Sequence, residues 1–263
     1  MFYESYGLTG LPFEERISPE KLLTDERFSR GLERFDYFAQ GGLVALLSGP
    51  TGAGKSSLLR LALSRLPANR FLPLVVQQGA LESASVLRLL VQTLNEKPRI
   101  GKDRLFAQIL QKVRSAERTT LLIVDEAHLL GELALTDLRL LVCAGAEQSP
   151  PLRLLLCGQD GLLHTLARQS LADLLNRVSV RIHLSALSKD QTVCYIDHRL
   201  KHVGGSEKLF ADEAKTRIHD FAGGIPRVIN NLATLCLIHG AARKLKQIST
   251  ALVDDAVQEL RMV

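Results

Sequence analysis

The sequence predicts an α/β fold with a parallel sheet, followed by a smaller domain built only of helices. One observation is an apolar run of strand length that leads through a glycine-rich loop, Gly49–Ser57, into a helical pattern. Another is that further apolar runs alternate with amphipathic helical patterns, as in sheets whose parallel strands are joined by helices. Beyond about residue 187 the pattern becomes purely helical. We therefore expect an N-terminal segment at 1–40, an α/β core at 41–187 and a helical domain at 188–263.

Composition is that of an ordinary globular protein, with 46% hydrophobic and 23% charged residues in a chain of 263. No apolar run approaches the ~18–20 residues that a membrane span needs. The start of the chain lacks the basic-then-apolar layout of a signal peptide. Four cysteines stand singly, without metal-ligand spacing, and are typical of small buried side chains in a reducing compartment. They are Cys143, Cys157, Cys194 and Cys236. We expect a cytoplasmic protein without a membrane partner.

The N-terminal segment carries an aromatic, proline-containing stretch and then a helical pattern at 25–40, with four apolar side chains on one broad face. The glycine-rich loop that follows has the spacing of a phosphate-binding P-loop, so an apolar stretch just before it is placed to pack near a nucleotide. Phe13 either contacts an adenine ring or covers an edge of the core, and the sequence leaves both alternatives open.

The loop after the first strand has the spacing of a phosphate-binding P-loop. It consists of Gly49, Pro50, Thr51, Gly52, Ala53, Gly54, Lys55, Ser56 and Ser57. Its glycines let successive backbone N–H groups point at phosphate oxygens, and the helix that follows adds its positive dipole end. Lys55 then reaches the β- and γ-phosphates, and the Ser56 hydroxyl is a ligand for Mg²⁺. The sequence predicts a site for ATP with Mg²⁺.

After a second apolar strand at 71–76 and a helix at 83–94, the chain carries a basic segment, residues 97–118. This segment holds seven Lys and Arg against two Asp and Glu, so it accounts for the +5 net charge of the whole chain. Its loop and helix start supply Lys97, Arg99, Lys102 and Arg104. One interpretation is a solvated helix face, and the other is a surface that contacts the phosphate backbone of duplex DNA.

A third apolar strand, residues 121–124, ends in two carboxylates, Asp125 and Glu126. Ligands of open α/β sheets bind at the carboxyl ends of strands, so both side chains are expected beside the P-loop. Asp125 is placed to hold Mg²⁺ together with Ser56, and Glu126 to activate the attacking water as a general base. The tetrapeptide Asp125–His128 resembles the motif that names one helicase superfamily, but companion helicase motifs are not seen in the sequence.

A fourth strand, 152–157, is followed by Gln159, which would lie near the two carboxylates and orient the attacking water. A short helix then ends in Arg177, a candidate arginine finger for a neighbouring subunit, with a surface salt bridge as the alternative. Residues 178–184 alternate in the way of a half-buried edge strand, on which Arg181 is a weaker candidate finger.

Four helices are predicted in the last part of the chain, at 188–202, 211–222, 226–240 and 250–260. Ser188 and Gln191 form a capping-box pattern at the first of them. Pro226 stands at a first helical position. Arg227 after it would face the nucleotide, and Pro226 is a further candidate contact at that site.

Together these motifs resemble the AAA+ ATPases of the ExeA/GspA type and the related transposition regulators of the TnsC/TniB type. The resemblance covers nearly the whole chain, and its most specific parts are 195–200 and 224–230. It implies a five-stranded parallel sheet with a C-terminal helical lid. It also implies ATP-dependent oligomers, rings or filaments, whose sites form between subunits. In such sites Gln159, Arg177 and Arg227 would act as sensor 1, the finger in trans, and sensor 2.

Secretion-type relatives carry a membrane span and a peptidoglycan-binding domain after the ATPase core, and this sequence shows neither. The resemblance therefore favours a helper ATPase that assembles on duplex DNA and controls a DDE-type transposase. The alternative function is an assembly ATPase that acts on protein partners, such as a secretion-system component, for which the basic charge is incidental.

Overall fold

The chain folds into two compact units, and the computed structural model describes residues 1–77, 82–147 and 151–261. The sheet unit contains Glu26–Gly49 and Lys55–Leu184. The helical unit contains Met1–Asp25, Pro50–Gly54 and the chain from Ser185 onward. The predicted N-terminal segment is thus divided, because its helix at 26–40 lies in the sheet unit.

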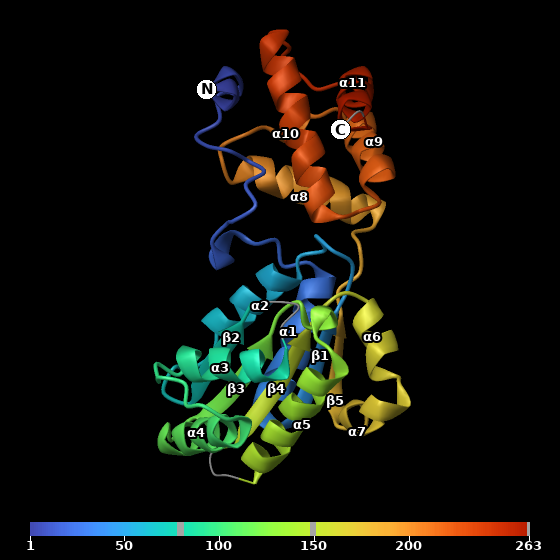
Figure 1. Cartoon of the computed structure of the whole chain (residues 1–263). Helices are drawn as coiled ribbons and strands as arrows, with labels where there is room; N and C mark the ends of the chain where they lie inside the picture. Colours follow the sequence, from blue (N-terminus) through green and yellow to red (C-terminus); the bar gives the residue numbers. More distant parts are fainter. Residues whose placement is uncertain (78–81, 148–150, 262–263) are drawn as a thin grey trace. The chain divides into compact units, whose positions relative to one another are not determined.

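The sheet unit is built on five parallel strands, as the sequence and the family resemblance predict (Figure 1). The strands are β1 (Val44–Ser48), β2 (Phe71–Val76), β3 (Thr119–Val124), β4 (Leu152–Cys157) and β5 (Val178–His183). Their order across the sheet is β2-β3-β4-β1-β5. Because β3, β4 and β1 are neighbours and parallel, the three loops that leave their carboxyl ends meet at one edge.

Burial along the strands follows from their position in the sheet. All five residues of β1 are buried, as expected for a strand between two neighbours and covered by helices on both faces. Strand β5 lies at the edge and alternates between buried and exposed side chains, which confirms the predicted half-buried edge strand.

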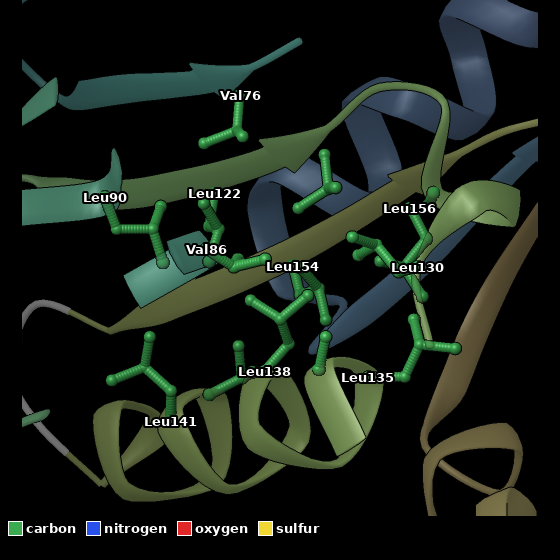
Figure 2. Close-up of a cluster of buried hydrophobic side chains, with 14 of the residues drawn as sticks. Val76, Val86, Leu90, Leu122, Leu130, Leu135, Leu138, Leu141, Leu154 and Leu156 are labelled. Atoms are coloured by element: carbon green, nitrogen blue, oxygen red, sulfur yellow. The ribbon is translucent and has the colours of Figure 1, made fainter. Parts of the chain in front are cut away.

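Helices connect the strands of the sheet unit and cover the sheet. They are α1 (Glu26–Gly41), α2 (Lys55–Ser64), α3 (Ser83–Thr93), α4 (Lys102–Ser115), α5 (Glu132–Ala146), α6 (Gly161–Leu166) and α7 (Ala172–Leu175). Figure 2 shows Leu122 and Leu154 of the sheet in one buried cluster with Leu90 of α3 and Leu138 of α5. On α1 the four predicted side chains Phe28, Leu32, Phe35 and Phe38 are all buried.

Within the described residues, three short 3-10 helices and four longer helices make up the helical unit. They are η1 (Phe2–Tyr6), η2 (Pro19–Lys21), α8 (Lys189–Lys201), η5 (Glu207–Leu209), α9 (Asp212–Ala222), α10 (Pro226–Ala242) and α11 (Thr250–Arg261). The capping box is present at α8, where the Ser188 hydroxyl accepts from the N–H of Gln191 and the Gln191 side chain accepts from the N–H of Ser188. No helix in the described part of the chain is long and apolar enough to cross a membrane.

A buried arginine fixes the N-terminal segment to the helical unit. The Arg199 guanidinium, 4% exposed, donates to the carbonyl oxygens of Pro12 and Glu14, each at 2.6 Å. It also donates to the Tyr195 hydroxyl at 3.2 Å, and that hydroxyl donates to Asn230 at 2.9 Å. A buried cation needs hydrogen-bond acceptors of this kind. The two sequence stretches most specific to the family resemblance therefore meet in one network.

Candidate nucleotide site

The P-loop joins β1 to α2 in a conformation that its glycines permit. Gly52 and Gly54 have φ angles of 80° and 104°, in the left-handed region that glycine adopts at low cost. At Gly49 an added Cβ would lie 2.3 Å from the carbonyl oxygen of Leu184, which directly follows β5. A side chain at position 49 would therefore push the P-loop away from the end of β5. The loop thus has the curled backbone that directs N–H groups at an anion.

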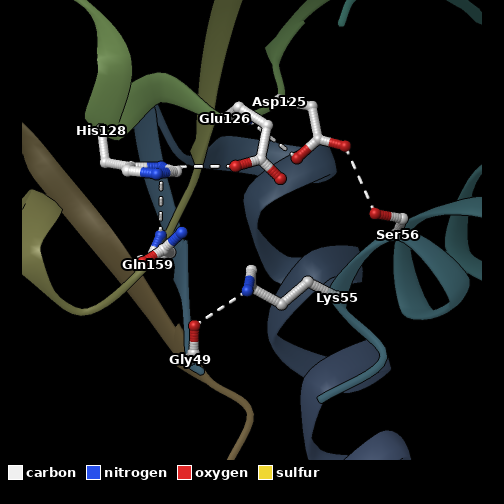
Figure 3. Close-up of polar contacts among 7 residues, drawn as sticks. All are labelled: Gly49, Lys55, Ser56, Asp125, Glu126, His128 and Gln159. Carbon is white, nitrogen blue, oxygen red and sulfur yellow. Dashed lines mark hydrogen bonds and ion pairs between the residues drawn. The ribbon is translucent and has the colours of Figure 1, made fainter. Parts of the chain in front are cut away.

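Lys55 and Ser56 open α2 at the end of this loop. Lys55 is 7% exposed, and its ammonium group donates to the carbonyl oxygen of Gly49 at 2.8 Å (Figure 3). This contact holds the charge against the P-loop rather than in solvent. The Ser56 hydroxyl lies 3.3 Å from the carboxylate of Asp125, which brings together the two residues predicted to hold Mg²⁺.

Asp125 and Glu126 follow β3 and take different environments. Asp125 is 7% exposed, and its carboxylate accepts a hydrogen bond from the N–H of Glu126 at 3.0 Å. Glu126 has φ 55° and ψ 32°, a left-handed conformation that costs a residue other than glycine on the order of 1 kcal/mol. Asp125 faces Ser56, while the Glu126 side chain, 46% exposed, faces His128 (Figure 3).

The thiol of Cys157, at the end of β4, lies beside Asp125. Burial and the neighbouring Asp125 carboxylate raise the pKa of this thiol well above its ordinary value. The thiol therefore stays protonated and adds no negative charge next to Asp125. Among the other cysteines Cys236 is buried as predicted, but Cys194 is exposed, because it lies on the outer face of α8.

His128 is the residue of this site that the sequence analysis missed. Its Nδ1 atom lies 3.5 Å from Oε2 of Glu126 and 3.5 Å from the backbone nitrogen of Gln159 (Figure 3). Gln159 follows β4 and is exposed at the carboxyl edge of the sheet, next to the residues that follow β3. The position of His128, two residues after the predicted general base, was the available signal.

The residues of this site fit a nucleoside triphosphate with Mg²⁺. Hydroxyl and carboxylate oxygens are the ligands that Mg²⁺ prefers, and Ser56 and Asp125 present one of each at hydrogen-bond distance from one another. The ammonium group of Lys55 supplies the positive charge that polyphosphates require.

Two predicted residues lie at the start of α10 in the helical unit. Pro226 occupies the first turn of the helix, as predicted, and the N–H of Arg227 lies 3.3 Å from the carbonyl oxygen of Gly52. The Arg227 guanidinium is 3.5 Å from a carboxylate oxygen of Glu15, and both side chains are more than half exposed. This ion pair is accordingly weak.

Phe13 is 5% exposed and packs edge-to-face against Phe210, with ring centroids 6.1 Å apart. Both rings belong to the hydrophobic core of the helical unit. The structure thus favours the second of the two alternatives for Phe13, a side chain that covers the core, and its contact with adenine stays a prediction.

Arg177 follows α7 and is exposed. Its guanidinium donates to the carbonyl oxygen of Asp173 at 3.1 Å, and it forms no ion pair within the described ranges. The alternative of a surface salt bridge therefore finds no partner among those residues. The backbone carbonyl of Arg181 accepts a hydrogen bond from Arg34.

The predicted basic residues divide into two groups. Lys97, Arg99 and Arg104 are exposed, and they have no ion pair with any residue that the structure describes. Lys102 instead lies 2.6 Å from the buried carboxylate of Asp137, which also accepts a hydrogen bond from Ser83. Since a buried carboxylate needs a partner, Lys102 has a structural role.

Comparison with known proteins finds a family match over part of this chain. Residues 39–166, which include the P-loop and the carboxylates after β3, match the family model described as an AAA domain. The five-stranded parallel sheet followed by helices is the fold of a P-loop AAA+ core with C-terminal helices, as predicted. At the level of the family these findings support a nucleotide-hydrolysing AAA+ ATPase, and the family implies ATP, usually with Mg²⁺.

Among individual proteins, the chain is 28% identical over 249 residues to general secretion pathway protein A of Aeromonas hydrophila. The match covers 92% of this chain and 45% of that protein, so the chain spans about half of its relative.

Solved structures share the fold at lower identity. CDC6P from Pyrobaculum aerophilum has a TM-score of 0.74 at 19% identity, covering 94% of this chain and 70% of that one. The ORC1 protein of Aeropyrum pernix, solved in complex with DNA, has a TM-score of 0.70 at 15% identity, covering 94% and 67%.

Proposed function

We propose that this protein is a cytoplasmic, self-associating AAA+ ATPase that binds duplex DNA through the first residues of its basic segment and regulates DNA transposition. The observation that carries the ATPase part is the convergence of Lys55 and Ser56, which follow β1, with Asp125 and Glu126, which follow β3; β4 lies between these two strands in the sheet. The proposal of DNA binding depends on the exposed basic side chains of Lys97 and Arg99, just before α4, and of Arg104 in its first turn.

Each residue of the site has a distinct task in hydrolysis. The P-loop N–H groups and Lys55 bind the phosphates, and Ser56 and Asp125 hold Mg²⁺, which neutralises charge on the phosphate oxygens when bound. Glu126 accepts the proton of the water that attacks the γ-phosphorus. Its carboxylate is half exposed and can be reached by that water. The exposed Gln159 orients the same water.

Charge that develops on the γ-phosphoryl group is stabilised by two arginines. Arg177 acts in trans on the site of a neighbouring subunit, and its exposed guanidinium, without an ion pair in the described ranges, supports this role. Arg227 couples the nucleotide to the helical unit. The hydrogen bond from its N–H to Gly52 supports a position near the phosphates. Hydrolysis sites formed between subunits account for self-association in a ring or filament.

DNA contact is supported by charge that is available for an external partner. Lys97, Arg99 and Arg104 are exposed without ion pairs among the described residues, and they lie within eight positions of each other. Lys102 stays a predicted contact, although its ammonium group also pairs with Asp137. Contacts from such residues are directed at phosphates and tolerate any sequence. A DDE-type transposase is then the client whose access to DNA the nucleotide state controls.

A second candidate function is the assembly of a protein complex, such as part of a secretion system. The similarity to general secretion pathway protein A over 92% of this chain favours it. In that case the basic segment is a solvated surface, and the client is a protein.

Salt dependence of DNA binding separates the two candidates. With ATP present, we expect the affinity for a 40-base-pair duplex to fall steeply with salt, and the Arg99→Ala/Arg104→Ala protein to have a log–log slope smaller by about two. The reason is that each neutralised phosphate releases its own counterions. Fluorescence anisotropy at 50 to 300 mM salt measures the slope.

Lys201→Ala/Lys208→Ala is the matched control, since it removes the same charge from exposed positions of the helical unit. An equal decrease in the slope for both double variants would mean that DNA binding depends only on the net charge of the protein. No binding by the wild-type protein at any salt concentration would favour the assembly function.

A further inference from the structure

One nitrogen atom of His128 lies between two groups of opposite hydrogen-bonding character. Nδ1 is 3.5 Å from a carboxylate oxygen of Glu126, which can only accept a hydrogen bond, and 3.5 Å from the backbone N–H of Gln159, which can only donate one (Figure 3). A ring nitrogen that carries hydrogen donates, and one without hydrogen accepts. His128 can therefore bond to Glu126 or to Gln159, but not to both through this atom.

The surroundings hold the ring in that place. The His128 side chain is only 15% exposed, and its residue belongs to the short 3-10 helix η3 (Ala127–Leu129) between β3 and α5. On the side of β4, a Cβ added to Gly158 would lie 3.2 Å from the backbone nitrogen of His128 and 3.3 Å from Nδ1. The absence of a side chain at Gly158 is thus what lets the loop after β4 approach the ring so closely.

The backbone of Glu126 is the third feature of this contact. Glu126 has a left-handed conformation, and in this conformation its carboxylate lies 3.5 Å from the His128 ring. Strained residues of this kind persist where the surrounding structure fixes them, and they cluster at functional sites. The strain at Glu126 and the space left by Gly158 come from different strands, and both serve the contact with His128.

We propose that His128 is a positioning residue for Glu126 and couples it to the loop that carries Gln159. The inference rests on the proposed ATPase function. When Nδ1 donates to Oε2, the Glu126 carboxylate is held with its other oxygen directed at the water. When the N–H of Gln159 donates to Nδ1 instead, Nδ1 cannot donate to Glu126, and the carboxylate loses this hydrogen bond. Movement of the Gln159 loop on contact with the γ-phosphate therefore decides whether the general base is in place.

The test is a set of His128 variants measured for both turnover and nucleotide affinity. We expect His128→Ala to lower kcat about tenfold, because a misplaced base loses much of its effect. The Kd for ATP should stay within about twofold of the wild-type value, since no hydrogen bond or ion pair joins His128 to Lys55, Ser56 or Asp125 among the residues that the structure describes. His128→Asn places an amide nitrogen where Nδ1 stood and should recover most of the rate.

A double-mutant cycle tests the coupling to the backbone N–H of Gln159. It uses Gln159→Pro, because proline lacks the N–H that a change to alanine would keep. If His128 acts through this contact, the loss of kcat in His128→Ala/Gln159→Pro should be clearly smaller than the product of the two single losses. His164→Ala, an exposed histidine of α6 without a hydrogen bond among the described residues, is the control and should keep the wild-type rate.

Three results would overturn the inference while the wild-type protein hydrolyses ATP. They are an unchanged kcat in His128→Ala, an equal loss in His128→Ala and His128→Asn, and independent effects in the cycle. A wild-type protein without ATPase activity would instead refute the proposed function, and with it this inference.

Discussion

Replacing Glu126 by Gln should lower the ATP turnover number by about 10²- to 10⁴-fold, because general-base catalysis contributes that much to such reactions. The amide has nearly the same shape as the carboxylate but cannot accept the proton of the attacking water. The Kd for ATP should change by less than about twofold, since Lys55, Ser56 and Asp125 do not depend on the Glu126 carboxylate. Phosphate release measures the rate, and titration with a fluorescent ATP analogue measures the affinity.

Glu33→Gln is the matched control, because Glu33 is an exposed residue of α1 and the same chemical change there should leave turnover unaltered. If the Glu126→Gln protein hydrolysed ATP at the wild-type rate, Glu126 would not be the general base. The account of the residues after β3 would then be wrong.

Replacing Arg177 by Ala should lower turnover by about 10³-fold, the lower end of what an arginine finger contributes. The predicted action in trans makes a sharper claim. A mixture of Arg177→Ala and Lys55→Ala proteins, each inactive alone, should regain activity. In such a mixture the Lys55→Ala subunit supplies an intact arginine, and its neighbour supplies an intact P-loop. Steady-state rates over a range of mixing ratios measure the recovery.

Arg181→Ala is the comparison that separates the two candidate fingers, and we expect a much smaller loss from it. An Arg177→Ala protein that is inactive and gains nothing on mixing would place the arginine in its own subunit. A nearly active Arg177→Ala protein would exclude it as the finger.

The sheet and the P-loop could be predicted because their signals are local. Each buried strand is a short apolar run, and the loop after β1 must be rich in glycine to curl around phosphates. The edge position of β5 could also be predicted, because a strand with one covered face alternates between apolar and polar residues. Asp125 and Glu126 were found because they end a buried strand, where polar residues are otherwise costly.

Contacts between residues far apart in the chain could not be predicted in the same way. The charge of Lys102 predicts DNA contact, whereas its ion pair with Asp137 depends on another helix and on the tertiary packing that buries this carboxylate. The contact of His128 with Gln159 depends on the neighbouring positions of β3 and β4 and on the backbone turn at Glu126. Arg199 binds carbonyl oxygens, which leave no trace in a sequence.

We infer that ATP binding loads this protein onto DNA. The Glu126→Gln protein is suited to test this, because it should hold ATP without consuming it. We would measure its binding to a duplex at moderate salt with ATP, with ADP and with neither. We expect tight, cooperative binding with ATP and much weaker binding in the other two states. Absence of binding in all three states would contradict it and would leave an ATPase whose client is a protein.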